Sequence, residues 1–178
     1  MARIVSVFGG SAPRPATPAY ADAQALGGLL ARAGWTVATG GYAGVMEAAS
    51  RGAAEAGGHV IGVTCNLIEN WKSLRANAWV KEEIKFTSLR ERLYHLVAFC
   101  DAAAALPGGV GTLSEVALTW SLLQTGEIRR KPFVVVGRVW SETLSTFIRE
   151  SDGYLHAGDA DLVRVANRLE DVLEMIKA

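Results

Sequence analysis

Short apolar runs alternate along the chain with longer segments in which apolar residues recur every three or four positions. The short runs are typical of strands buried on both faces of a parallel sheet. The longer segments are typical of helices with one apolar face. Strands are predicted at residues 4–8, 35–39, 59–64, 79–86, 102–106, 132–137 and 162–165, and helices at about 18–33, 45–56, 89–100, 116–123 and 169–176. Residues 66–77 are expected to be irregular.

Local signals mark several helix ends. Thr17 and Pro18 favour a helix start, because proline is well tolerated at the first helical position, and Gly34 favours the end of that helix. Ser88 and Glu91 form a capping-box pattern. The alternation of strands and helices predicts an α/β fold, a Rossmann-like doubly wound parallel sheet with helices on both faces. We find no repeat or linker, so a single nucleotide-binding domain over residues 1–178 is expected.

Three glycine-rich loops follow predicted strands. They begin at Gly9, Gly40 and Gly108. In an open α/β sheet the ligand crevice lies beyond the carboxyl ends of the strands. The three loops are therefore expected to converge on one ligand site.

The third loop belongs to the most informative segment of the chain. Its glycines allow the backbone to approach a ligand closely, and the free N–H groups of the following helix start favour a phosphate. The carboxylate of Glu115 places a candidate reactive group beside this phosphate site. Thr112 and Glu115 also fit a capping box, in which both side chains serve only the helix start. The segment is Pro107, Gly108, Gly109, Val110, Gly111, Thr112, Leu113, Ser114 and Glu115.

Composition narrows the classes of function. Lys plus Arg and Asp plus Glu both number 18, so no electrostatic attraction to nucleic acid or to a membrane is expected. Cys65 and Cys100 have no Cys or His at metal-ligand spacing, so neither a metal site nor a disulfide framework is expected. No apolar run reaches spanning length and no signal peptide is recognisable, which predicts a cytoplasmic protein.

Two common nucleotide sites do not fit the sequence. Gly9, Gly10 and Ser11 follow the first strand in place of G-x-G-x-x-G, and Ser114 replaces the third glycine of the later loop, which argues against an NAD site. No G-K-[ST] occurs, which excludes a P-loop. No lysine lies in a recognisable cofactor motif, so no cofactor is expected and Schiff-base decarboxylation is not supported.

Residues 107–115 resemble the PGGxGTxxE signature of the Lonely Guy family of cytokinin-activating phosphoribohydrolases, a family that also carries a lysine decarboxylase label. Arg92 aligns with the active-site Arg of that family, whereas Leu93 and Leu96 replace the Lys and Met of its R-K-x-x-M helix. Two further loops resemble the first Gly-Ser loop and the GGGxxG[LI]M loop of the family, the latter with Thr39 in place of its first glycine. They supply Gly9, Gly10, Ser11, Gly40, Gly41, Gly44 and Met46.

The resemblance implies hydrolysis of the N-glycosidic bond of a purine nucleoside 5′-monophosphate, either AMP or a cytokinin type, to free base and ribose 5-phosphate. The matched loop residues, with residues 107–112, would bind the substrate. Glu115 would stabilise the ribose cation or activate water, and Arg92 would anchor the ligand and orient Glu115. The resemblance also implies a homodimer or higher homo-oligomer.

Three alternatives stay open. Arg92 borders the apolar face of its predicted helix, where a snorkelling arginine would cover the core with its stem. Molybdenum-cofactor carrier proteins look similar in fold and glycine loops, and Leu93 and Leu96 favour such a non-catalytic carrier. A nucleotide-sensing module that binds a partner protein is the third alternative.

Overall fold

The computed structural model describes residues 2–72, 74–151 and 153–177. Among these residues, seven strands form one sheet in the order β4-β3-β2-β1-β5-β6-β7, and every neighbouring pair is parallel. The chain therefore forms the predicted doubly wound α/β sheet. The strands are β1 (Ile4–Phe8), β2 (Thr36–Thr39), β3 (Val60–Cys65), β4 (Glu82–Phe86), β5 (Ala102–Ala105), β6 (Phe133–Val136) and β7 (Arg164–Ala166).

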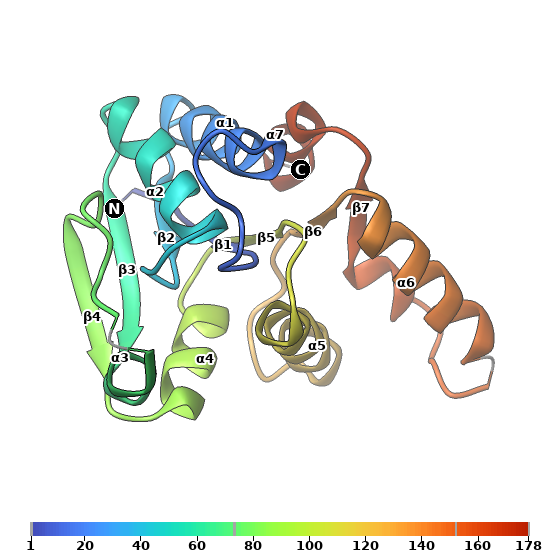
Figure 1. Cartoon of the computed structure of the whole chain (residues 1–178). Coiled ribbons are helices and arrows are strands. Elements are labelled where there is room, and N and C mark those ends of the chain that lie inside the picture. The colour runs from blue at the N-terminus through green and yellow to red at the C-terminus, as the bar shows by residue number, and fades with distance from the viewer. Residues whose placement is uncertain (1, 73, 152, 178) are drawn as a thin grey trace.

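Helices cover both faces of the sheet, as Figure 1 shows. Helices α1 (Pro18–Arg32), α2 (Val45–Glu55) and α7 (Leu169–Lys177) pack on one face around Val7 and Val37. Helices α4 (Leu89–Ala98), α5 (Val110–Thr125) and α6 (Arg138–Glu150) pack on the other face around Phe8 and Phe133. Adjacent residues of β1 thus enter two different hydrophobic clusters, because successive side chains of a strand point to opposite faces.

Several helix ends follow the predicted signals. The Thr17 hydroxyl accepts a hydrogen bond from the Tyr20 N–H at the start of α1, and Ser88 forms the predicted capping box with Glu91. These side chains satisfy N–H groups that have no partner within the helix. Local sequence therefore determines where α1 and α4 begin.

Three predicted segments are corrected by the structure. Residues 66–72 form α3 (Asn66–Lys72) where an irregular segment was expected. This segment contains no Gly or Pro, and Glu69 in its first turn favours the positive end of the helix dipole. The strand predicted at 162–165 is present as β7 but begins two residues later, at Arg164, because residues 160–162 form a short 3-10 helix, η1 (Ala160–Leu162). Helix α5 begins at Val110, well before the predicted start at 116.

No helix in the described ranges is long and apolar enough to cross a membrane.

Candidate functional site

The three glycine loops lie in contact at the carboxyl ends of β1, β2 and β5. The Gly10 N–H donates to the Pro107 carbonyl at 3.2 Å, and the Val45 N–H donates to the Gly10 carbonyl at 2.9 Å. Gly44 has φ 74° and would place a Cβ 2.5 Å from the Gly10 carbonyl oxygen. The first loop is therefore held between the other two, where a parallel α/β sheet binds its ligands.

The third loop presents free backbone N–H groups at the start of α5. Gly109 is the N-cap, and the first helical hydrogen bond runs from Leu113 N–H to the Gly109 carbonyl at 3.0 Å. The N–H groups of Val110, Gly111 and Thr112 precede that bond and have no helical acceptor. Because the helix dipole adds positive potential at the same point, this helix start can bind an anion.

The glycines of the third loop differ in what surrounds them. A Cβ on Gly108 would lie 2.2 Å from the Thr112 hydroxyl and 2.7 Å from the Gly10 nitrogen, so Gly108 is required for packing. A Cβ on Gly109 or Gly111 would meet no described heavy atom within 4 Å, and both residues are exposed. The open side of the loop thus lies at Gly109 and Gly111.

Glu115 lies inside the fold and is not part of a helix cap. The interpretation of Thr112 and Glu115 as a capping box is wrong, because Gly109 starts the helix and no side chain caps it. Both side chains are instead buried, with Glu115 only 8% exposed. Burial raises the pKa of Glu115 to about 7, and the nearby positive charge of Arg92 opposes that increase. Near neutral pH the carboxyl group is therefore poised to give or take a proton.

Arg92 lies in a closely fitted slot beside this carboxyl group. Its Nε donates to the Val63 carbonyl at 2.7 Å, and its Nη2 donates to the Gly40 carbonyl at 3.1 Å. Arg92 is 5% exposed, so the snorkelling interpretation, which keeps the guanidinium in water, is wrong. Two of the five N–H donors of an arginine are used by these carbonyls, which leaves three for a ligand or for Glu115.

Gly40 and Met46 complete this slot. A Cβ on Gly40 would lie 2.1 Å from Arg92 Nη2 and 2.6 Å from the Met46 sulfur. The side chains of Arg92 and Met46 therefore occupy the space beside Gly40, which has no side chain of its own. Gly41 lies behind them, has φ 77° and packs against Thr64.

Three other positions singled out from the sequence have different surroundings. Ser11 is exposed, and its carbonyl accepts a hydrogen bond from Arg14. Leu96 is fully buried, and Leu93 packs against the same hydrophobic cluster. The two leucines that replace the Lys and Met of the Lonely Guy pattern thus contribute to the core.

Two residues that contact this slot or its loop, Tyr42 and Asn77, were not predicted from the sequence. The Arg92 guanidinium lies over the Tyr42 ring, 5.6 Å from its centroid. The Asn77 side-chain amide donates to the carbonyls of Gly41 and Tyr42, at 3.0 and 3.1 Å. Tyr42 lies inside a glycine motif that was singled out, but nothing in the local sequence indicates its contact with Arg92.

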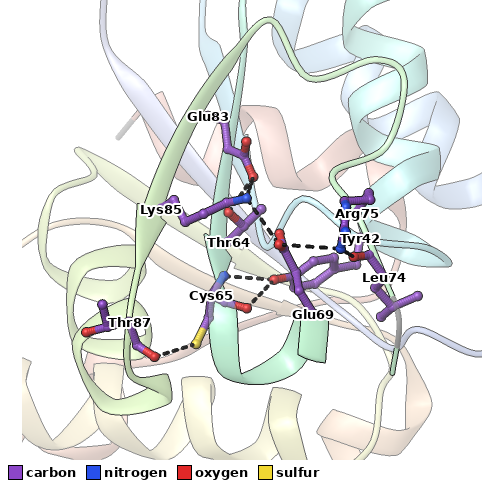
Figure 2. Close-up of polar contacts among 9 residues, drawn as sticks. All are labelled: Tyr42, Thr64, Cys65, Glu69, Leu74, Arg75, Glu83, Lys85 and Thr87. Carbon is purple, nitrogen blue, oxygen red and sulfur yellow. Dashed lines mark hydrogen bonds and ion pairs between the residues drawn. The ribbon is translucent and has the colours of Figure 1, made fainter. Parts of the chain in front are cut away.

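A polar cluster adjoins Tyr42 (Figure 2). Glu69 of α3 is buried and forms an ion pair with Lys85 at 3.1 Å. Lys85 also pairs with Glu83, which accepts a hydrogen bond from Thr64 at 2.6 Å. These contacts tie α3 to the edge strand β4 at the carboxyl end of β3.

The described residues contain no group of three or more His, Cys, Asp or Glu side chains suited to a metal ion. An open cavity of about 380 Å³ adjoins Val45, Pro107 and Val136 on the face covered by α1 and α7. Neither Arg92 nor Glu115 lines this cavity, so it is separate from the candidate catalytic groups.

Comparisons with known proteins bear on this geometry. A family model described as the SLOG cluster4 family matches residues 2–155. A rice (Oryza sativa subsp. japonica) protein named as a probable cytokinin riboside 5′-monophosphate phosphoribohydrolase is 35% identical over 133 residues, which cover 73% of this chain and 52% of that protein. The chain thus spans about half the length of the rice relative.

Two other similar proteins match over nearly the whole chain. A Rhodococcoides fascians cytokinin riboside 5′-monophosphate phosphoribohydrolase is 28% identical and covers 98% of this chain and 89% of its own. The structure of a molybdenum cofactor binding protein from Rippkaea orientalis has a TM-score of 0.76 at 29% identity, covering 99% of this chain and 96% of that one. The resemblance to the Lonely Guy family that was predicted from sequence is confirmed.

Proposed function

The chain belongs to the SLOG cluster4 family, and on this premise we propose that it is a phosphoribohydrolase that cleaves the N-glycosidic bond of a purine nucleoside 5′-monophosphate. The observation that carries this proposal is the buried Glu115 carboxyl group. Its pKa is raised to about 7, it lies near Arg92, and it follows the free N–H groups of α5 by one turn of helix. The substrate is AMP or a cytokinin-type nucleotide, and lysine decarboxylation is not proposed.

The 5′-phosphate binds at the start of α5. The N–H groups of Val110, Gly111 and Thr112 and the dipole of the helix supply its partners. Exposed glycines at 109 and 111 let the phosphate reach the backbone. This position brings the ribose toward the next turn of the helix, where Glu115 lies.

Cleavage transfers the electron pair of the bond between C1′ and the base nitrogen to the base. The ribose then carries positive charge, as in glycoside hydrolysis. Ionised Glu115 stabilises that charge and accepts a proton from the attacking water, while the oxygen of the water bonds to C1′. The proton that Glu115 takes from water passes to the departing base, which restores ionised Glu115 and yields free base and ribose 5-phosphate.

Arg92 anchors the substrate and holds Glu115 in place. A guanidinium carries a permanent charge, so Arg92 does not act as a general base. Its buried position and its two carbonyl acceptors fix the planar group before substrate arrives. Preorganised charge of this kind acts most strongly where water is excluded.

Release of free base is the direct test. Purified protein is incubated with AMP and with cytokinin riboside monophosphates, and base and ribose 5-phosphate are measured by chromatography. Glu115→Gln keeps the side-chain shape, and we expect it to lower turnover by about 100-fold or more while nucleotide affinity changes only a few-fold. Glu127→Gln, a change at an exposed glutamate, is the matched control. Folded protein that releases no base from any of these nucleotides contradicts the proposal.

A second candidate function is a non-catalytic carrier of a phosphorylated pterin. The similarity to the Rippkaea orientalis molybdenum cofactor binding protein over nearly both chains favours it, as do Leu93 and Leu96. A carrier would copurify with a pterin and would show no hydrolysis. Fluorescence of the released pterin distinguishes the two functions.

We also propose that residues 1–178 form one domain and that the protein is cytoplasmic. We propose further that it assembles as a homodimer or higher homo-oligomer. Exposed apolar side chains on α4 and α5, two helices that contact each other, support the assembly, because a second copy of the chain could cover them. They are Leu89, Tyr94, Val110 and Leu113. A monomeric mass by light scattering across micromolar concentrations would count against it.

A further inference from the structure

The glycine loops are not the only part of the chain that surrounds the Arg92 guanidinium. The carbonyl oxygens of Gly40 and Val63 fix two of its N–H groups at the ends of β2 and β3. The absence of a side chain at Gly40 leaves the room for Nη2. These two hydrogen bonds hold Nε and Nη2 of the planar group.

The Arg92 guanidinium lies over the ring of Tyr42. The distance from Arg92 Cζ to the centroid of the Tyr42 ring is 5.6 Å, within the range of a cation–π interaction. Tyr42 is 3% exposed, so water does not compete for the face of its ring. A desolvated aromatic face attracts a cation more strongly than an exposed one.

Hydrogen bonds hold Tyr42 both at its hydroxyl and at its backbone carbonyl. Its hydroxyl accepts a hydrogen bond from Cys65 N–H at 2.8 Å and donates one to the Cys65 carbonyl at 3.1 Å (Figure 2). At the backbone end, Asn77 donates to the Tyr42 carbonyl. The α3–β4 cluster of Glu69 and Lys85 lies just beyond the hydroxyl, as Figure 2 shows. The Tyr42 ring is therefore held in one position, with the Arg92 guanidinium over it.

We propose that Tyr42 is a positioning residue for the Arg92 guanidinium, which it holds in register with Glu115. This inference rests on the proposed function for its catalytic consequence, but the geometry that it describes does not. Tyr42 does not touch the substrate and acts through Arg92. A tyrosine that only filled the core would stabilise the loop without affecting the charge beside Glu115.

A double-mutant cycle separates these two roles. Tyr42→Leu removes the aromatic face, and we expect kcat to fall about tenfold while KM changes less than about threefold. In an Arg92→Ala background the same change should alter kcat by less than about twofold, because the residue through which it acts is gone. Tyr42→Phe keeps the ring and should retain more turnover than Tyr42→Leu. Tyr154→Leu, at a tyrosine that is 86% exposed, is the matched control.

A second measurement tests the geometry without turnover. The positive charge of Arg92 lowers the pKa of Glu115, so release of Arg92 from its slot should raise that pKa. We expect Tyr42→Leu to raise it by about half a pH unit in an NMR titration of the carboxyl carbon of Glu115, and Tyr154→Leu to leave it unchanged.

The outcomes distinguish this inference from the proposed function. Equal losses of kcat in both backgrounds, or an unchanged Glu115 titration in folded Tyr42→Leu, overturn the positioning role. If the wild-type protein hydrolyses no nucleotide, the proposed function fails, and the titration alone still decides whether Tyr42 positions Arg92.

Discussion

Two glycine loops on either side of the candidate site use glycine for opposite reasons. In the Gly40–Gly44 loop the glycines are buried, and an added Cβ at Gly40, Gly41 or Gly44 would collide with neighbouring atoms. In the Gly108–Gly111 loop an added Cβ at Gly109 or Gly111 would meet no described atom within 4 Å. The Gly40–Gly44 loop needs glycine because neighbouring atoms, those of Arg92 beside Gly40, leave no room for side chains, whereas the Gly108–Gly111 loop has room for a ligand at Gly109 and Gly111.

Opposite charges also lie beside the two loops, Arg92 of α4 beside the first and Glu115 of α5 beside the second. The buried loop surrounds the Arg92 guanidinium, which has carbonyl partners and an aromatic face. The exposed loop leads into α5 and to Glu115, whose carboxylate accepts no hydrogen bond from the described residues. Substitutions in the Gly40–Gly44 loop should therefore lower the stability of the fold. Glu115, by contrast, itself destabilises the fold when its carboxyl group is ionised.

The largest expected effect is the decrease in unfolding free energy at high pH, where the buried Glu115 carboxyl group ionises. Its pKa in the folded protein, about 7, lies above its ordinary value of 4.5, so the folded state holds the proton more tightly. The associated stability is fully present below pH 4.5 and is lost as the pH rises through 7. Glu115→Gln removes this dependence, so the unfolding free energy of the variant relative to wild type should increase by about 3 kcal/mol between pH 4 and pH 8.

Urea denaturation at both pH values measures that difference. Glu127→Gln, at an exposed position, should show no such divergence from wild type. Parallel stability curves for Glu115→Gln and wild type would mean that the carboxyl group ionises freely in the folded protein.

Gly40→Ala tests the buried loop. The new Cβ would lie 2.1 Å from Arg92 Nη2, so the guanidinium must leave its slot. We expect a loss of about 2 kcal/mol in unfolding free energy and a fall of about 30-fold in turnover. Gly109→Ala, which meets no described neighbour within 4 Å, should leave the unfolding free energy within about 0.5 kcal/mol. Equal destabilisation by the two alanines would remove the distinction between the loops.

The pH dependence of turnover tests whether Glu115, with its raised pKa, is the general base. If ionised Glu115 is the base, kcat/KM should rise up to about tenfold per pH unit on the acid side and level off above about pH 7. The second ionisation of the substrate phosphate, near pH 6, should steepen the profile below that value. An inflection near 4.5, the ordinary pKa of a glutamate, would assign the general base to another group.

Gly111→Ala has the smallest expected effect on the fold and tests the exposed loop alone. Alanine is favoured over glycine inside a helix, so the unfolding free energy should rise by about 0.5 kcal/mol. The added methyl group stands where the phosphate approaches, so the dissociation constant for AMP should increase about tenfold. Calorimetric titration that finds unchanged affinity in this variant would show that the open space at Gly111 does not receive the ligand.

The two loops also show which features sequence could predict. Apolar runs and glycine positions locate the strands and place the loops at their carboxyl ends, because both are local consequences of burial and backbone freedom. The position of Glu115 follows from its motif, but its pKa depends on burial and on Arg92, which lies on another helix. The spacing of Thr112 and Glu115 fits a capping box as well as a buried face, and only the start of α5 at Gly109 decides between them.

Long-range contacts explain what sequence analysis missed. Tyr42 depends on Cys65, 23 residues later, and on Arg92 in a separate helix. Helix α3 has only seven residues, and the ion pair of Glu69 with Lys85 on β4 stabilises it from outside. Neither contact leaves a periodic pattern in the local sequence, so the irregular segment predicted for residues 66–77 was wrong over α3.

The place of β1 in the sheet has a consequence for synthesis of the chain. Among the seven described strands of the sheet β1 is made first, yet it lies in the interior of the sheet between β2 and β5. It can pair with β2 once residue 39 has emerged, but its other edge must wait until residue 105. A nascent chain therefore carries an open edge of β1 while residues 9–105 are being made, and an unpaired strand edge can pair with a second nascent chain.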